Sequence, residues 1–153
     1  MIAENGRDYK ELPHLTEGDE EFRKKFLSWD LGNISFVDVQ EYLKVKDTIL
    51  VPMASFEQHG PHLPIYTDTI TCIEMARRVA EMIAVLHTPP IWMGYSPQHM
   101  FDPGMGRGTI TVRSSVLLNL VNDVARSLIH HGFNRIIFIN GHGSNVKVID
   151  PVL

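Results

Sequence analysis

The sequence predicts an α/β protein with three layers, in which helices cover both faces of a mainly parallel sheet. Short continuous apolar runs, which suit buried strands, alternate with segments whose apolar residues recur every three or four positions. The connections between these runs are long enough to hold a helix, as crossovers between parallel strands require. The predicted strands are 48–55, 89–97 and 134–141, and the predicted helices lie within 35–47, 67–86 and 114–132.

The composition excludes several classes of function. Of 153 residues, 44% are hydrophobic and 21% charged, which is typical of one soluble globular domain. The formal net charge of -4 offers no basic surface to nucleic acid, and no apolar run approaches the roughly 20 residues that cross a membrane. A single cysteine, Cys72, and the lack of an apolar signal peptide favour a cytoplasmic protein.

Two regions are expected along the chain. Residues 1–30 are polar and mixed in charge, so we expect an N-terminal extension that wraps the domain or is partly disordered. Residues 31–153 form the domain itself. It opens with apolar residues at helical spacing in 36–43, where Ser35 is the expected N-cap, and continues into the β-branched run 48–55.

Two longer helices follow from the same periodicity. In 67–86, Thr71 and Glu74 have the spacing of a capping box. In 114–132, serines stand at the start and Gly132 takes the expected C-terminal position.

The segments around the second long helix complete the predicted order. The run 89–97 is expected to be a short strand, and a glycine-rich surface excursion leads from it to the helix. The strand 134–141 is expected to end in the loop "GHGSN", residues 141–145.

Two histidine-bearing loops, 55–68 and 140–145, directly follow predicted strands. In parallel sheets ligands bind beyond the carboxyl ends of the strands, so both loops are expected at the same edge. The two loops can therefore share one site.

Four residues in these loops have metal-binding chemistry. Glu57 and His59 are two positions apart and project to the same side of an extended segment. Asp68 lies nine residues after His59, and His142 stands between two glycines that allow close backbone approach. Two imidazoles and two carboxylates suit zinc, manganese or a related divalent ion, and the lack of further cysteines argues against a structural thiolate site.

Each of these residues also has a simpler interpretation. Asp68 could cap a helix, Glu57 could be a solvated loop residue, and His59 or His142 could be a hydrogen-bonded loop histidine. His62 is expected to shape its loop rather than bind metal. The "GHGSN" segment could cradle a phosphate, although it lacks the lysine of a P-loop.

The stretches "EQHGPHLP..TD" and "NGHGSN" resemble the creatininase (creatinine amidohydrolase) family. "GYSPQH" followed by "GTITV", and "WDLGNISFVDVQEYL", are similar to further segments of this family, so the resemblance extends from about residue 29 to the C-terminus. It implies a creatininase-like fold and a pair of metal ions bridged by Asp68, with Glu57 and His142 on one ion and His59 on the other. It further implies zinc, with manganese or another divalent ion as alternatives, a substrate-pocket position for His99, and a homo-oligomer, a hexamer in many members.

The function that the resemblance implies is metal-dependent hydrolysis of a C–N bond, in a cyclic amide or formamide-type small substrate, by a metal-activated water. The alternatives are ring-opening C–C hydrolysis of a cyclic diketone in carbohydrate catabolism, and an inactive truncated member that serves in assembly. We also expect the domain to be C-terminally incomplete. Ser144 stands where creatinine-cleaving members carry a metal-binding glutamate, and the sequence ends at Leu153, before the later motif that supplies a carboxylate in other members.

Overall fold

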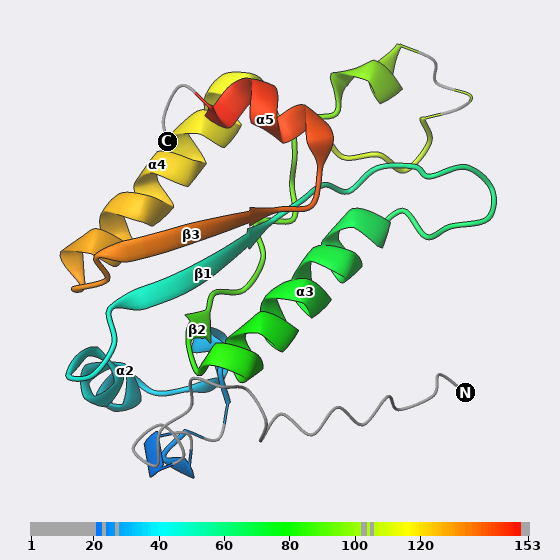
Figure 1. Ribbon diagram of the computed structural model, residues 1–153. Coiled ribbons are helices and arrows are strands. Elements are labelled where there is room, and N and C mark those ends of the chain that lie inside the picture. The colour runs from blue at the N-terminus through cyan, green and yellow to red at the C-terminus, as the bar shows by residue number, and fades with distance from the viewer. Residues whose placement is uncertain (1–20, 23, 27, 102–103, 105, 151–153) are drawn as a thin grey trace.

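The computed structural model describes residues 21–22, 24–26, 28–101, 104 and 106–150 (Figure 1). It confirms the predicted α/β class, because the sheet is parallel, its strands run in the order β2-β1-β3, and helices pack on both faces. The strands are β1 (Thr48–Met53), β2 (Leu86–His87) and β3 (Arg135–Asn140). The helices are α2 (Phe36–Leu43), α3 (Thr67–Ile83), α4 (Ser114–His130) and α5 (Gly143–Ile149), and two 3-10 turns are η2 (Leu31–Asn33) and η3 (Pro97–Met100).

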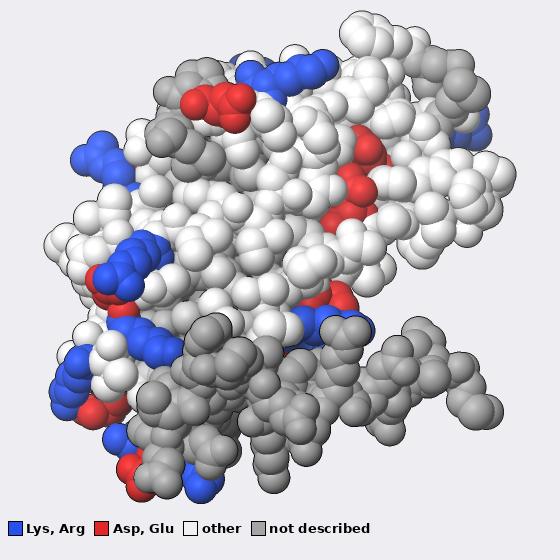
Figure 2. Space-filling model, in the orientation of Figure 1, with Lys and Arg blue, Asp and Glu red and all other residues white. Residues whose placement is uncertain are grey.

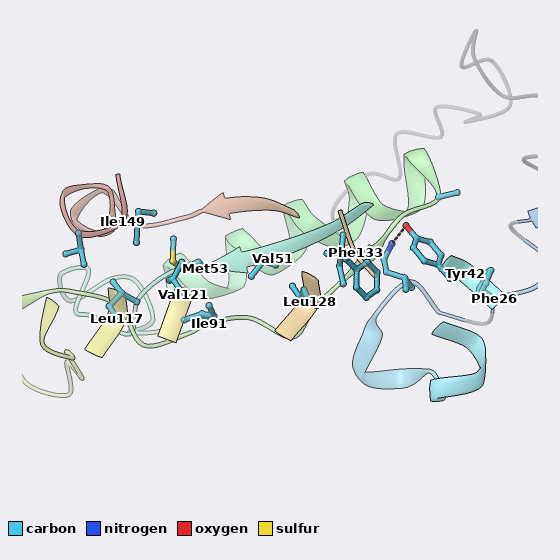
Figure 3. Packing of buried hydrophobic residues seen from close by; sticks show 14 of the residues in the cluster. Phe26, Tyr42, Val51, Met53, Ile91, Leu117, Val121, Leu128, Phe133 and Ile149 are labelled. Carbon is cyan, nitrogen blue, oxygen red and sulfur yellow. Dashed lines mark hydrogen bonds between the residues drawn. The ribbon is translucent and has the colours of Figure 1, made fainter. Parts of the chain in front are cut away.

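The central strand β1 is buried on both faces, which explains its continuous apolar sequence. Ile49, Val51 and Met53 belong to the larger core cluster, together with apolar residues of α4 (Figure 3). Leu50 points to the other face and packs with Ala80 of α3. The alternation places the sheet between α3 and α4, as the predicted three layers require.

Helix α2 begins as the sequence predicts. Ser35 Oγ accepts a hydrogen bond from the Asp38 backbone N–H, while the Asp38 carboxylate accepts one from the Ser35 N–H. This reciprocal capping box fixes the start of the helix. At its other end Tyr42 is fully buried, and its hydroxyl donates to the Thr48 carbonyl at 2.6 Å.

Helix α3 differs from the prediction at both ends. No capping box forms at Thr71 and Glu74, since the helix already begins at Thr67 and the Thr71 hydroxyl donates to the carbonyls of the preceding turn. The helix ends at Ile83 because Ala84 adopts a left-handed conformation, with φ 54. The residues after Ala84 are thereby free to form β2.

The predicted strand 89–97 is wrong, because the strand beside β1 is the short β2 that precedes it. Pro89 and Pro90 have no backbone N–H and interrupt the ladder. Beyond them only isolated bridges form, one from Ile91 to Met53 and one from Gly94 to Thr111. The chain still follows β1 towards its carboxyl end.

Helix α4 and strand β3 are confirmed, and Gly132 takes its expected place after α4 with φ 103. The prediction that "GHGSN", residues 141–145, forms a loop is wrong. Only Gly141 and His142 separate β3 from α5, and residues 143–145 form the first turn of this helix. A glycine-rich loop that could cradle a phosphate is therefore not formed by residues 141–145.

Most of the predicted extension 1–30 lies outside the described residues. Of its described part, Phe22 and Phe26 are buried, and their ring centroids lie 5.9 Å and 6.0 Å from that of Tyr42. The described helices include none that is both long and apolar enough for a membrane span.

Candidate metal site

All four residues predicted as ligands lie where β1 and β3 end. Glu57 and His59 belong to the segment that leaves β1, and the Glu57 N–H donates to the Ile65 carbonyl at 3.1 Å, which folds this segment back on itself. Asp68 lies in the first turn of α3, and His142 follows β3 directly. The fold thus brings His142 to the same edge of the sheet as Glu57, His59 and Asp68, the edge where β1 and β3 lead into α3 and α5 (Figure 1).

Asp68 is the centre of the cluster. Its Oδ1 lies 2.9 Å from His59 Nε2, and its Oδ2 lies 3.0 Å from His142 Nδ1. Oδ2 also accepts a hydrogen bond from Ser55 Oγ at 2.9 Å. The two oxygens of one carboxylate therefore face two different imidazoles.

Glu57 closes the cluster from the side of His142. Its Oε1 lies 3.4 Å from His142 Nδ1. Ligand atoms of Glu57, His59 and Asp68 all lie within 4.8 Å of one another. This spacing allows the side chains to converge on an ion without rearrangement of the backbone.

Backbone carbonyls fix the orientation of both imidazoles. His59 Nδ1 lies 2.9 Å from the Glu57 carbonyl, and His142 Nε2 lies 3.1 Å from the Tyr95 carbonyl. A carbonyl oxygen can only accept, so these two nitrogens carry protons. The opposite nitrogens, His59 Nε2 and His142 Nδ1, then face the oxygens of Asp68.

A lone pair that faces a carboxylate oxygen at about 3 Å is repelled unless a cation lies between them. That cation is either a second proton on the ring or a metal ion. The hydrogen bond with the Glu57 carbonyl raises the pKa of His59, partial burial opposes this, and the negative charge of Asp68 raises it further. Metal-binding histidines characteristically donate their other ring N–H to a carbonyl or carboxylate, as both histidines do here.

The environment of Glu57 also fits a cation. Glu57 is only 8% exposed, so it is not the solvated loop residue of the simpler interpretation, and its buried carboxylate needs positively charged or hydrogen-bonding neighbours. The described ion-pair partners of Glu57 and Asp68 are all histidines. Figure 2 shows a patch of Asp and Glu side chains, bordered by residues other than Lys and Arg, near the carboxyl ends of the strands. Nitrogen and oxygen donors in this mixture suit zinc or manganese.

The helix-cap interpretation of Asp68 does not describe this side chain. No side-chain hydrogen bond caps α3, and the carboxylate is taken up by Ser55 and the two histidines. His62, expected to have no metal role, is exposed. His99 lies in η3, and its Nε2 is 3.5 Å from Glu57 Oε2, so it borders the cluster.

Several supporting residues were not predicted. Ser55 holds Asp68, and Asn145 joins two loops by donating to the Ala54 carbonyl at 3.0 Å and accepting from the Tyr95 N–H at 3.0 Å. Ser55 is the last residue of the predicted strand 48–55, and this position at a strand end is the one signal in the sequence that could have indicated it. Gly141 has a different role from the one expected, because an added Cβ would meet Cys72 Cβ at 2.8 Å, so this glycine serves packing on α3.

Comparison with known proteins places these features in one family. Residues 32–153 match the creatininase family model, described as creatinine amidohydrolase. The chain is 36% identical over 110 residues to 3-dehydro-scyllo-inosose hydrolase of Thermotoga maritima, which covers 72% of this chain and 34% of the relative. It is 36% identical over 107 residues to the mycofactocin precursor peptide peptidase of Mycolicibacterium smegmatis, a match that covers 66% of this chain and 41% of the relative. It is 30% identical over 121 residues to creatinine amidohydrolase of Pseudomonas putida, covering 78% and 46%.

Solved structures give the same answer for the fold. A crystal structure of creatinine amidohydrolase (creatininase) superimposes with a TM-score of 0.74 at 29% identity, covering 82% of this chain and 49% of the other. A Zn-Zn form of a creatininase variant gives a TM-score of 0.73 at 29% identity, covering 80% and 48%, and a structure described as creatininase Mn gives 0.72 at 28%, covering 80% and 49%. The chain spans about half the length, or less, of the relatives that it matches. On its sequence match and its fold, the chain belongs to the creatininase family.

Proposed function

We propose that this chain is a metal-dependent hydrolase that cleaves a C–N bond in a small substrate, with Glu57, His59, Asp68 and His142 as the metal ligands. The observation that carries the proposal is the arrangement around Asp68. Each of its oxygens faces an imidazole nitrogen, and each imidazole is oriented by a backbone carbonyl. Such orientation of ligands from the outer side is characteristic of protein metal sites.

The geometry supports two unequal positions for ions. Asp68 Oδ2, His142 Nδ1 and Glu57 Oε1 lie on one side of the cluster, at separations of 3.0 Å and 3.4 Å from the imidazole nitrogen. Asp68 Oδ1 and His59 Nε2 lie on the other, 2.9 Å apart. We therefore assign Glu57 and His142 to one ion and His59 to the other, with Asp68 shared between them.

A bound divalent ion lowers the pKa of a water molecule and polarises a carbonyl oxygen, which is what hydrolysis of an unactivated C–N bond needs. The protein residues supply the rest. Glu57 and Asp68 offset part of the positive charge, and the carbonyls of Glu57 and Tyr95 keep the imidazoles in the orientation that presents a lone pair. Zinc is our first choice of ion and manganese the second, since the donors are nitrogen and oxygen only.

The choice of a C–N bond rests on the relatives, since an amidohydrolase and a peptidase both cleave such bonds. A second candidate, ring-opening C–C hydrolysis of a cyclic diketone, is favoured by the identity of 36% to 3-dehydro-scyllo-inosose hydrolase. The same arrangement of ligands serves both reactions, so the pocket around the ions decides between them.

Metal analysis combined with a substrate panel tests the proposal. The purified chain, loaded with zinc or manganese, is expected to retain metal through gel filtration and to hydrolyse a member of a panel of lactams, formamides and short peptides. Asp68→Ala is expected to lose both properties. Cyclic diketones are assayed beside this panel. Turnover of cyclic diketones alone would favour the second candidate, and bound metal without turnover of any compound would favour a role in assembly. Failure of the wild-type chain to retain metal would refute the proposal.

The cytoplasmic location and the homo-oligomeric state, a hexamer by family resemblance, also belong to this proposal. The thiol of Cys72 is buried beside the backbone carbonyls of Met53 and Ile139, and burial raises its pKa, so it is a poor partner for oxidation. Sedimentation equilibrium of the purified chain would measure the oligomeric state directly.

A further inference from the structure

His99 borders the cluster from a segment far away in the sequence. It lies in η3, and its side chain is held between two groups: Gln58 Nε2 lies 3.1 Å from His99 Nδ1, and Glu57 Oε2 lies 3.5 Å from His99 Nε2. Neighbouring residues in sequence, Glu57 and Gln58, thus contact opposite nitrogens of one imidazole. The imidazole of His99 thus lies between the neutral side-chain amide of Gln58 and the buried carboxylate of Glu57.

The orientation of the Gln58 amide is fixed by the backbone. Its Oε1 accepts a hydrogen bond from the Gly60 N–H at 2.8 Å, so its Nε2 is the atom that faces His99. The Gln58 backbone is itself held, because its N–H donates to Thr109 Oγ1 at 3.1 Å. An amide nitrogen can only donate, and therefore His99 Nδ1 accepts and the proton of the neutral ring is on Nε2.

The proton on His99 Nε2 faces an oxygen that lacks a partner. Glu57 Oε2 is buried and accepts no other hydrogen bond in the described part of the chain. A separation of 3.5 Å is at the outer limit of a hydrogen bond, so a small rotation of either side chain completes it. An unpartnered carboxylate oxygen is costly when buried, which favours this rotation.

The backbone of His99 is packed closely against Gly106. A Cβ added at Gly106 would lie 1.8 Å from the His99 carbonyl oxygen, so the two segments are packed against each other at a distance that only glycine permits. The η3 turn is thereby held over Gln58 and Glu57.

We propose that Gln58 holds His99 in the tautomer with the proton on Nε2, and that His99 is a positioning residue that orients Glu57 by donating to Oε2. Glu57 Oε1 is then left to face His142. This assignment gives His99 a role towards Glu57, in addition to the substrate-pocket position expected from the family resemblance. It rests on the proposed function only in that Glu57 is taken there as a metal ligand, whereas the tautomer itself does not depend on metal.

The tautomer can be read directly from the ring nitrogens of the metal-free protein. In the neutral imidazole of 15N-labelled protein, the nitrogen that carries a proton resonates far upfield of the one that does not. We expect Nε2 of His99 to carry the proton. In Gln58→Glu the new carboxylate can accept from both Gly60 N–H and His99 Nδ1–H, so the proton is expected to move to Nδ1. Gln40→Glu, an exposed glutamine in α2, is the matched control and is expected to leave the His99 spectrum unchanged.

The consequence for metal is measured separately. Loss of an outer hydrogen bond to a ligand weakens metal binding by about 10- to 100-fold, so Gln58→Glu and His99→Ala are each expected to raise the dissociation constant for zinc by that factor. Gln40→Glu is expected to leave it unchanged. A wild-type ring protonated on Nδ1, or an unchanged tautomer in Gln58→Glu, would overturn the inference. A wild type that binds no zinc but shows the expected tautomers would refute the proposed function and leave the positioning of His99 by Gln58 intact.

Discussion

Replacing Asp68 by asparagine keeps the shape of the side chain but removes the negative charge that both imidazoles face. In the structure the carboxylate lies 2.9 Å from His59 Nε2 and 3.0 Å from His142 Nδ1, and it also accepts from Ser55 Oγ. The side chain is 16% exposed, so water screens these interactions only weakly. Asp68→Asn therefore distinguishes two roles for Asp68. In the first it is a shared metal ligand, and in the second it is an ion-pair partner of protonated histidines.

The two interpretations predict different free energies of unfolding. If Asp68 binds metal, an ion present at one hundred times its dissociation constant stabilises the wild type by about 2.7 kcal/mol. For a chain of this size that is a rise of about 5–11 °C in Tm, and Asp68→Asn loses most of it. Without metal the asparagine can still accept from Ser55 and donate to one histidine, so we expect a change of at most about 1 kcal/mol.

Differential scanning calorimetry of both proteins, with chelator and with zinc, measures these quantities. Asp123→Asn on the exposed side of α4 is the matched control, because it makes the same chemical change far from the cluster. The control is expected to respond to zinc as the wild type does.

The opposite pattern would contradict the metal interpretation. If Asp68 instead forms a buried ion pair with protonated His59 and His142, its removal costs about 3–5 kcal/mol in the presence of chelator. A loss of this size, together with a wild-type Tm that zinc does not change, would mean that the cluster stabilises the fold without an ion.

Other predictions concern single residues and can be checked in parallel. His59→Ala is expected to lower the metal content of the purified protein strongly, while His62→Ala, at an exposed position in the same loop, leaves it unchanged; equal losses would point to the shape of the loop. Metal titration is expected to show one tight ion and a second weak one. With Asp68 shared, the described residues would supply three ligands to one ion and two to the other. Tyr42→Phe leaves the Thr48 carbonyl without its donor and is expected to cost about 1–3 kcal/mol in urea denaturation. Burial raises the pKa of Tyr42 to about 12, so this contribution is complete below about pH 10 and is lost as pH rises towards 12, a loss that the phenylalanine variant should lack.

The sequence predicted the elements whose pattern spans many residues. The strands β1 and β3 and the helices α2, α3 and α4 all have repeated apolar spacing over at least six positions. It failed on β2 and α5, which are 2 and 7 residues long. Helix α3 ends at Ile83 because the next residue, Ala84, is in the left-handed conformation. Glycine or asparagine usually occupies such a position, and alanine gives no such signal. The strand that follows was therefore predicted as the last turn of the helix.

The candidate site shows the same division. The proximity of the four proposed ligands could be predicted because their residue types are informative and because the ends of parallel strands share one edge. The groups that orient them were not found, since the carbonyls of Glu57 and Tyr95 belong to the backbone and leave no trace in residue type. The pairing of Gln58 with His99 joins residues 41 positions apart and depends on where η3 lies.

The arrangement of the backbone also explains why the site depends on the fold more than on its loop sequence. Asn145 binds the Ala54 carbonyl and the Tyr95 N–H, so it fixes the segment that carries Ser55 and Glu57 relative to the carbonyl that orients His142. It is fully buried in the first turn of α5. Helix α5 therefore connects the two loops through a single side chain, although it carries none of the proposed ligands. Since the imidazole of His142 is oriented by Tyr95 and that of His59 by Glu57, a shift of either loop would move a lone pair away from Asp68. The precision of the cluster thus comes from hydrogen bonds to the backbone, which a short motif in the sequence cannot specify by itself.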